Sequence, residues 1–274
     1  MSELDPQQGW QLEEGSAEAY ERYLVPLLFA PGAEYLIELA ELGTGERVLD
    51  VACGTGIVAR RAALRVGPGR KVVGLDMNEG MLEVARKVSS EAQPTIEWQQ
   101  GDATAMPLPD DAFDAVFCQQ ALQFFPDRLA ALREMYRALA PNGRLALSVL
   151  RSTEHNPGYR LLADTLERHV GSDAGSMMRS PFSSLSADEL RELIAGAGFG
   201  KVRILLGIAP VRYPSAEEFL RWEGASSPLA GPIGALSEDA RESLIRDLGE
   251  ALRTYTDDDG IVFPAETYLA VAHR

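Results

Sequence analysis

A glycine turn after a short apolar run is the feature of this sequence most suggestive of chemistry. Gly54-Thr55-Gly56 follows the run Val48–Ala52, and Asp50 lies inside that run. Glycines let the backbone approach a ligand closely because they carry no Cβ atom. A lone carboxylate is unusual within an apolar strand. The pattern therefore predicts a binding site for a ligand with positive charge near Asp50.

A second interpretation of the same glycines is a dinucleotide site. Gly54 to Ala59 fits G-x-G-x-x-A, a fingerprint of nicotinamide and flavin cofactors. Asp76 ends the next apolar run and suits a ribose diol under either interpretation. Asp50 favours the cationic ligand, because a pyrophosphate gains nothing from a neighbouring carboxylate. An NAD(P)-dependent oxidoreductase with a Rossmann fold stays as the alternative.

Short apolar runs alternating with helical patterns are expected to position these residues. The expected strands are Arg47–Ala52, Lys71–Asp76, Thr95–Gln99, Phe113–Cys118 and Arg144–Leu150. Repeated strand–helix units imply right-handed crossovers and a parallel sheet covered on both faces. The sequence therefore predicts a doubly wound α/β fold, which binds ligands at the carboxyl ends of its strands.

The second half of the chain resumes this pattern with interruptions. Strands are expected at 201–209 and 261–272, the latter interrupted at Pro264, which gives a mostly parallel sheet of about seven strands. Helical insertions are expected at about 152–183 and 214–258, after the fifth and sixth strands. Insertions at strand ends often build substrate pockets, so we expect these two to form a substrate cap.

The N-terminal segment is expected to be a separate helical lid. Ser16–Leu42 has the pattern of two amphipathic helices, separated near Pro31-Gly32. We therefore expect residues 1–42 to form the lid and residues 43–274 to form the main domain.

Composition limits the classes of partner and compartment. The net charge of −15 disfavours a nucleic-acid partner, because an acidic surface repels phosphate backbones. The first residues lack the basic and apolar regions of a secretory signal, and no apolar run approaches the ~20 residues that span a bilayer. Cys53 and Cys118 are too few for a disulfide framework or a cysteine-based zinc site. We expect a cytoplasmic protein without a membrane span.

Five motifs in order resemble those of the class I S-adenosylmethionine-dependent methyltransferases. They are Val48–Gly56, Gly74–Met77, Gly101–Ala103, Phe113–Val116 and Leu139–Leu145. The subgroup most similar to this chain is the small-molecule, quinone-methylase-like enzymes, also called methyltransferase type 11. The resemblance implies a Rossmann-like fold and S-adenosyl-L-methionine as the cofactor.

The resemblance also implies roles for individual residues. Asp50 would orient the turn and act on the ammonium group of the cofactor, Asp76 would accept from the ribose hydroxyls, and Asp102 would accept from the adenine amine. Asp102 as an ordinary turn residue and Tyr23 as the inner face of its helix stay as alternatives. The implied cofactor contacts are Asp50, Ala52, Cys53, Gly54, Gly56, Asp76, Met77, Asp102, Ala103, Cys118, Gln119 and Tyr23.

The expected reaction is in-line transfer of a methyl group to an oxygen, nitrogen or carbon atom of a small, apolar or aromatic metabolite. His155, near Arg151 and Asn156, is the candidate for a general base or substrate contact. No metal is implied, because Cys118-Gln119-Gln120 is not a carboxylate cluster. A cofactor-binding protein without activity stays as an alternative, and the oligomeric state stays open, with a homodimer as one option.

Overall fold

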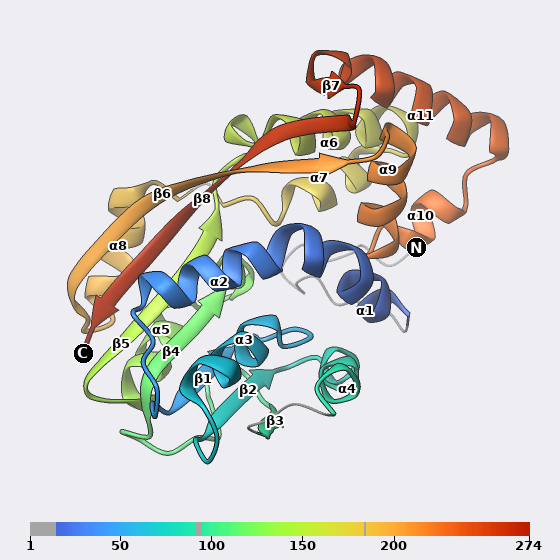
Figure 1. The fold of residues 1–274 in the computed structure, drawn as a ribbon. Helices are drawn as coiled ribbons and strands as arrows, with labels where there is room; N and C mark the ends of the chain where they lie inside the picture. The colour runs from blue at the N-terminus through green and yellow to red at the C-terminus, as the bar shows by residue number, and fades with distance from the viewer. Residues whose placement is uncertain (1–14, 91–94, 184) are drawn as a thin grey trace. The chain divides into compact units, whose positions relative to one another are not determined.

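The computed structural model describes residues 15–90, 95–183 and 185–274, and Figure 1 shows its ribbon. The chain divides into two compact units. Unit 1 comprises residues 1–28, 150–184 and 207–267, and unit 2 comprises residues 29–149, 185–206 and 268–274.

Unit 2 is built on an open sheet with the strand order β3-β2-β1-β4-β5-β8-β6, of which residues 207–213 of β6 and 260–267 of β8 belong to unit 1. Its strands are β1 (Val48–Val51), β2 (Val72–Asp76), β3 (Ile96–Gln100), β4 (Phe113–Gln119), β5 (Leu139–Leu150), β6 (Gly200–Tyr213) and β8 (Gly260–His273). The register is parallel from β3 through β2, β1 and β4 to β5. The expected doubly wound, mostly parallel sheet is therefore confirmed.

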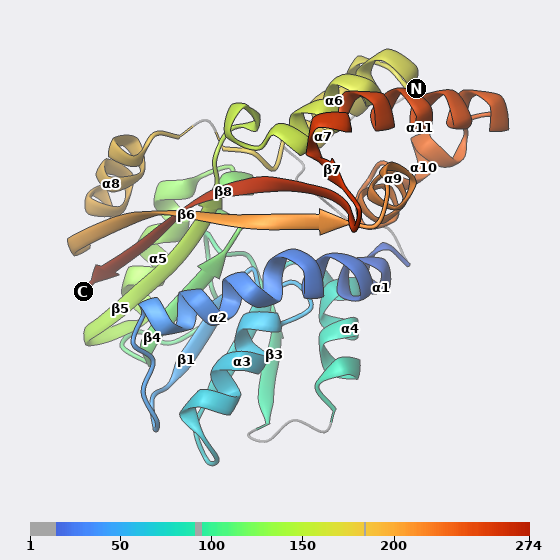
Figure 2. The ribbon, with the colours of Figure 1, turned by 45° about the horizontal axis from the view of Figure 1, so that its top comes forward.

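Helices cover both faces of this sheet, as Figure 2 shows. The helices of unit 2 are α2 (Ala30–Leu39), α3 (Ile57–Val66), α4 (Glu79–Val88), α5 (Arg128–Ala138) and α8 (Ala187–Gly196), with a 3₁₀ turn at Leu122–Phe124. Leu132 of α5 and Ile194 of α8 pack with Leu49 and Val51 of β1 in one buried cluster. Burial of these side chains from water holds the strand ends in place.

Two local expectations were wrong, and the sheet has one short strand more than expected. Residues 16–39 are helical throughout, as α1 (Ser16–Ala19), a π-helix (Tyr20–Phe29) and α2, with no break at Pro31-Gly32. Pro31 takes a first-turn position of α2, where a missing N–H costs little. β8 runs through Pro264 without interruption. An eighth strand, β7 (Thr256–Asp257), pairs antiparallel with β8, and its two residues are too few to show a period.

Unit 1 contains the helices expected in the insertions. They are α6 (Pro157–His169), α7 (Ser172–Arg179), α9 (Ala216–Ala225), α10 (Ala230–Gly234) and α11 (Glu238–Ala251), with 3₁₀ turns at Thr153–His155 and Arg253–Tyr255. Its core is aromatic, with Tyr159, Tyr213, Phe219 and Phe263 in mutual ring contact. No helix within the described ranges is long and apolar enough to cross a membrane.

Candidate functional site

The glycine turn lies at the carboxyl end of β1, in unit 2. Ala52, Gly54 and Gly56 have φ values of 53°, 55° and 84°, in the left-handed region that favours glycine. The turn closes through the Gly56 N–H, which donates to the Cys53 carbonyl at 2.8 Å. The Cys53 N–H donates to the Leu75 carbonyl at 3.0 Å, which fixes the turn to β2. The backbone is thus folded tightly at the end of two neighbouring strands.

Asp50 caps the helix that follows the turn. Gly56 is the N-cap residue of α3 and has no side chain to offer. The Asp50 Oδ2 atom takes that role and accepts from the Ala59 N–H at 3.0 Å. Burial raises the pKa of Asp50 to about 8, the bond from Ala59 opposes this shift, and the charge of Asp76 adds to it. A cation bound nearby would favour the ionised carboxylate.

Asp76 is tied to the same turn. Its Oδ2 atom accepts from the Gly54 N–H at 2.8 Å, and its Oδ1 atom accepts from the Asn78 N–H at 2.9 Å. Burial raises the pKa of Asp76, and backbone N–H donors, led by Asn78, oppose the rise. Each carboxylate oxygen keeps acceptor capacity after one bond, so the group can also accept from the two hydroxyls of a diol.

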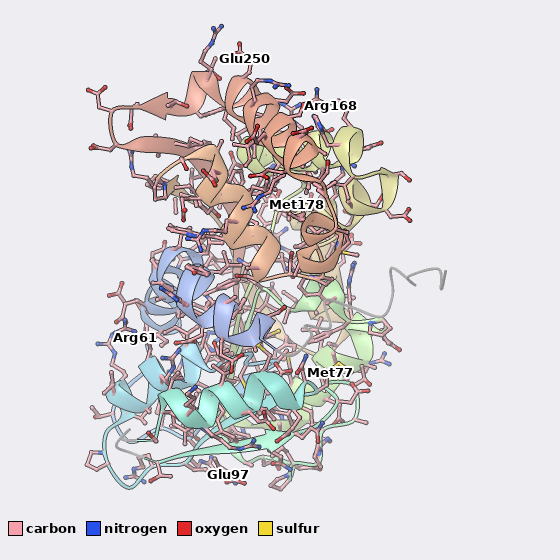
Figure 3. All side chains as sticks on the ribbon, turned by 90° about the vertical axis from the view of Figure 1, so that its right-hand side faces the viewer. Arg61, Met77, Glu97, Arg168, Met178 and Glu250 are labelled. Carbon is pink, nitrogen blue, oxygen red and sulfur yellow. The ribbon has the colours of Figure 1, made fainter. Side chains whose placement is uncertain are left out.

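Met77, Asp102 and Ala103 lie at the next strand ends. Met77 has 59% of its surface exposed and lies beside the start of α4 (Figure 3). The Asp102 Oδ1 atom accepts from the N–H and hydroxyl of Thr104, each at 2.8 Å. Asp102 thus accepts the hydrogen bonds of a turn, and its exposed carboxylate retains an oxygen for a ligand. Ala103 is buried.

Cys118 and Gln119 end β4. Burial raises the pKa of the Cys118 thiol and of the Cys53 thiol well above the usual range, so neither is a ready nucleophile. The Gln119 side-chain amide donates to the Phe29 carbonyl at 3.0 Å. A Cβ atom on Gly32 would lie 2.8 Å from the Gln119 Nε2 atom. Gln119 thus holds the start of α2 close to the end of β4.

Two hydroxyl groups at the strand ends of unit 2 are buried. The Thr55 hydroxyl in the turn and the Ser148 hydroxyl near the end of β5 have no hydrogen-bond partner within the described residues. Such groups are expected to be satisfied in the native state, by water or by a ligand. Together with two buried carboxyl groups, they fit a ligand that carries a cation and several hydroxyls. Ser148 was missed, although a serine inside an apolar strand was a signal.

Tyr23 and His155 belong to unit 1. The Tyr23 ring stacks on Trp222 with centroids 5.4 Å apart, and its hydroxyl accepts from Arg221 at 2.9 Å. The His155 Nε2 atom lies 2.8 Å from an Arg151 guanidinium nitrogen, and its Nδ1 atom lies 3.8 Å from Glu266.

The surroundings of His155 form a small network. Arg151 forms an ion pair with Glu266, whose backbone N–H donates to the Asn156 side chain at 2.9 Å. Glu266 could not be found from the sequence, because it lies more than 100 residues after Arg151 and Asn156 along the chain. Across the described ranges, no group of three or more His, Cys, Asp or Glu side chains is placed to hold a metal ion.

Comparison with known proteins identifies the fold and the family. A methyltransferase-domain family matches residues 49–147. Demethylmenaquinone methyltransferase of Listeria welshimeri is 33% identical over 181 residues, which cover 62% of this chain and 76% of the relative. The family match runs from within β1 into β5 and includes the glycine turn, Asp50, Asp76 and Asp102.

Two solved structures share the fold. The YcgJ protein of Bacillus subtilis superposes with a TM-score of 0.60 at 22% identity, covering 89% of this chain and 98% of that protein. Phosphoethanolamine N-methyltransferase 2 of Haemonchus contortus, solved in complex with S-adenosyl-L-methionine, gives 0.61 at 20% identity, covering 96% of this chain and 58% of that one. The oxidoreductase alternative is not favoured. This chain belongs to the class I S-adenosylmethionine-dependent methyltransferases.

Proposed function

We propose that this enzyme transfers the methyl group of S-adenosyl-L-methionine to a small, apolar aromatic molecule of the quinol class. The observation that supports S-adenosyl-L-methionine as the methyl donor is the glycine turn joined to two buried carboxyl groups, Asp50 and Asp76. Similarity to demethylmenaquinone methyltransferase supports the acceptor half. The acceptor atom is a ring carbon or oxygen in this proposal.

The proposed cofactor contacts follow the strand ends of unit 2. Asp76 accepts from the ribose hydroxyls, and Asp50 acts on the ammonium group. Asp102 accepts from the adenine amine while the Ala103 N–H donates to the ring, and Met77 packs on the adenine. The remaining proposed contacts are backbone groups of Ala52, Cys53, Gly54, Gly56, Cys118 and Gln119, and the Tyr23 hydroxyl.

When bound, the cofactor supplies a methyl group that its sulfonium makes electrophilic, and the bond between the methyl carbon and the sulfur breaks as the acceptor atom attacks. The protein's task is to hold donor and acceptor in line and to exclude water. Such positioning can lower a barrier by ~7–11 kcal/mol. Asp76 serves this task by accepting from the Gly54 N–H in the turn, and Asp50 by accepting from the Ala59 N–H in the first turn of α3.

A quinol acceptor must also lose a proton, and His155 is the proposed contact or base for that step. Arg151 is only a donor, so a neutral His155 accepts from it through Nε2 and carries its proton on Nδ1, toward Glu266. The Nε2 atom of His155 can accept a substrate proton only after the ring moves away from Arg151. Turnover of His155→Gln tests this role, which predicts a fall in kcat without a matching change in the Kd for S-adenosylhomocysteine.

Unit 1 is the proposed source of acceptor specificity. We propose the N-terminal residues 1–42 as a lid, with residues 152–183 and 214–258 as the substrate cap on a main domain of residues 43–274. A variant lacking residues 1–30 should lose turnover if this holds. Full turnover in that variant would reject the lid. Residues 1–14 lie outside the described ranges.

The remaining proposals concern location and partners. We propose a cytoplasmic enzyme with a small-molecule acceptor and no nucleic-acid partner, consistent with two free, buried cysteines. A homodimer remains one option, which sedimentation equilibrium would test.

Turnover on a panel of acceptors tests the proposed function directly. Purified enzyme with S-adenosyl-L-methionine is offered a demethylated naphthoquinol, a simple phenol and phosphoethanolamine, and products are identified by mass spectrometry. The proposal predicts a methylated naphthoquinol together with an equal amount of S-adenosylhomocysteine. Methylation of phosphoethanolamine alone would contradict the acceptor class, and Asp76→Ala serves as the control with weakened cofactor binding.

A further inference from the structure

The indole ring of Trp98 occupies the space that a side chain at one position of the neighbouring strand would need. Trp98 lies on β3 in register with Gly74 of β2. A Cβ atom on Gly74 would lie 2.3 Å from the Trp98 Cζ3 atom and 2.4 Å from its Cε3 atom. Such approaches do not occur between real atoms, so the indole ring requires a glycine at position 74. Gly74 has no positive φ that would explain the glycine otherwise.

The far edge of the same ring reaches the glycine turn. A Cβ atom on Gly56 would lie 2.1 Å from the Trp98 Cη2 atom. Gly56 therefore has two structural causes, the indole ring beside it and its φ of 84°. A protein side chain therefore occupies the space beside the Gly56 Cα atom.

The other edge of the indole is anchored to a helix end. The Trp98 Nε1–H donates to the Ser89 Oγ atom at 3.1 Å, and the Ser89 hydroxyl donates to the Ala85 carbonyl at 2.6 Å. Ser89 is the C-cap residue of α4. The ring is thus fixed at one edge and presses on the turn at the other.

These contacts lie on both sides of the bond that joins the turn to Asp76. Gly56 follows Gly54, whose N–H donates to Asp76, and Gly74 precedes Asp76 on β2. A rigid ring touching both glycines sets the spacing between the turn and the strand. That spacing decides where the free acceptor sites of Asp76 point.

We propose that Trp98 is a positioning residue for cofactor binding, which supports the glycine turn and holds it in register with Asp76. This inference rests on the proposed assignment of Asp76 and the turn to the cofactor. The ring acts from inside the protein and does not touch the ligand. Removal of the ring lets the turn relax and weakens binding of the adenosine part, whereas an aromatic replacement keeps most of the support.

The first test compares Trp98→Ala and Trp98→Phe with a matched control. Met135→Ala removes a buried side chain from α5, in the cluster on the other face of the sheet. Calorimetric titration with S-adenosylhomocysteine measures Kd, and thermal unfolding measures stability. Trp98→Ala should raise Kd about tenfold, Trp98→Phe less than about threefold, and Met135→Ala should leave Kd unchanged despite its own loss of stability. An equal Kd in Trp98→Ala and wild type, or an equal rise in Met135→Ala, would overturn the proposal.

A second test uses the close approach of the Trp98 ring to Gly74. Gly74→Ala should weaken binding about tenfold in the wild-type background, because the methyl group collides with the indole. In the Trp98→Ala background the same substitution should change Kd less than about twofold. Equal effects in both backgrounds would overturn the proposal.

A third readout keeps the Trp98 ring in place. Trp98 is one of three tryptophans, and a Trp10→Phe, Trp222→Phe protein reports its fluorescence alone. Titration with S-adenosylhomocysteine should give a saturable change with the calorimetric Kd, and a flat response would contradict coupling of the ring to the site. Failure of the wild type to bind S-adenosylhomocysteine at all would instead defeat the proposed cofactor contacts.

Discussion

Each unit buries carboxyl groups, but the two sets are held by different partners. In unit 2, Asp50 and Asp76 accept hydrogen bonds from backbone N–H groups of the glycine turn and of the residues beside it. In unit 1, Glu223 accepts from the Tyr213 hydroxyl at 2.5 Å, and the Tyr213 and Tyr159 hydroxyls lie 3.0 Å apart. Burial raises the pKa of Glu223 to about 7 and that of Asp50 to about 8.

The difference teaches that a raised pKa alone does not mark a functional site. Glu223 is enclosed by aromatic residues, and its tyrosine partners are buried too, with their pKa values raised by burial. The hydrogen bonds of this network connect buried residues of unit 1 to one another and stabilise this unit. The aspartates of unit 2 instead fasten a turn whose Thr55 hydroxyl lacks a partner within the described residues, and this turn is the ligand site that we propose.

The largest effect is expected for Glu223→Ala. The substitution leaves a cavity and removes the carboxyl group that accepts from the Tyr213 hydroxyl, so the free energy of unfolding should fall by about 2–4 kcal/mol. Chemical denaturation measures it, with Glu217→Ala, exposed on the same helix, as the control with little effect. The Kd for S-adenosylhomocysteine should stay unchanged. A tenfold weaker Kd would break the distinction between the two units.

The pH dependence of stability should also come in part from Glu223. Its pKa is about 7 in the folded protein and near 4.5 unfolded. The stabilising contribution is therefore complete below pH 4.5 and is lost as the pH rises through 7. Between pH 5 and 8 the wild type should lose about 2 kcal/mol relative to Glu223→Gln. Parallel stability curves for the two proteins would show that Glu223 does not titrate in this range.

Asp76→Ala should weaken cofactor binding at least tenfold, which corresponds to about 1–3 kcal/mol for lost hydrogen bonds to a charged group. Calorimetry with S-adenosyl-L-methionine measures this change. Glu97→Ala, on the exposed side of β3 (Figure 3), is the matched control and should bind as the wild type does. Unchanged affinity in Asp76→Ala would remove this residue from the site.

Binding should release a proton from Asp50. Free Asp50 is largely protonated below its pKa of about 8, and a cationic ligand favours the ionised form. Affinity should therefore rise with pH, by about tenfold between pH 6 and 7.5. Asp50→Asn keeps an oxygen for the Ala59 N–H and should give a flat profile. A wild-type profile that is equally flat would mean that the cation does not sense Asp50.

The smallest effect is expected for Asp102→Ala. Its carboxylate is exposed and already accepts two bonds from Thr104, so the loss of one ligand contact should weaken binding only about threefold. Competition calorimetry can resolve such a change. A loss as large as that of Asp76→Ala would mean that the exposed strand end contributes as much as the buried one.

The two units also differ in what their sequences predict. The strands of unit 2 and the aspartates at their ends could be read from apolar runs ending in polar residues, because strand periodicity and turn chemistry are local. The supporting role of Trp98 could not, since β3 meets the turn only through the folded sheet. In unit 1 the helices were predictable, whereas the Tyr159–Tyr213–Glu223 network joins residues of three separate elements. The strand β7, which pairs with β8, has two residues and was too short to show the alternation of a strand in the sequence.

A crystal structure of the complex with S-adenosylhomocysteine tests the central assignment most directly. The account predicts both ribose hydroxyls within hydrogen-bond distance of the Asp76 carboxylate and the amino-acid portion beside the glycine turn, on the side of Asp50. A ligand bound elsewhere, with Asp76 still bonded only to Gly54 and Asn78, would contradict it.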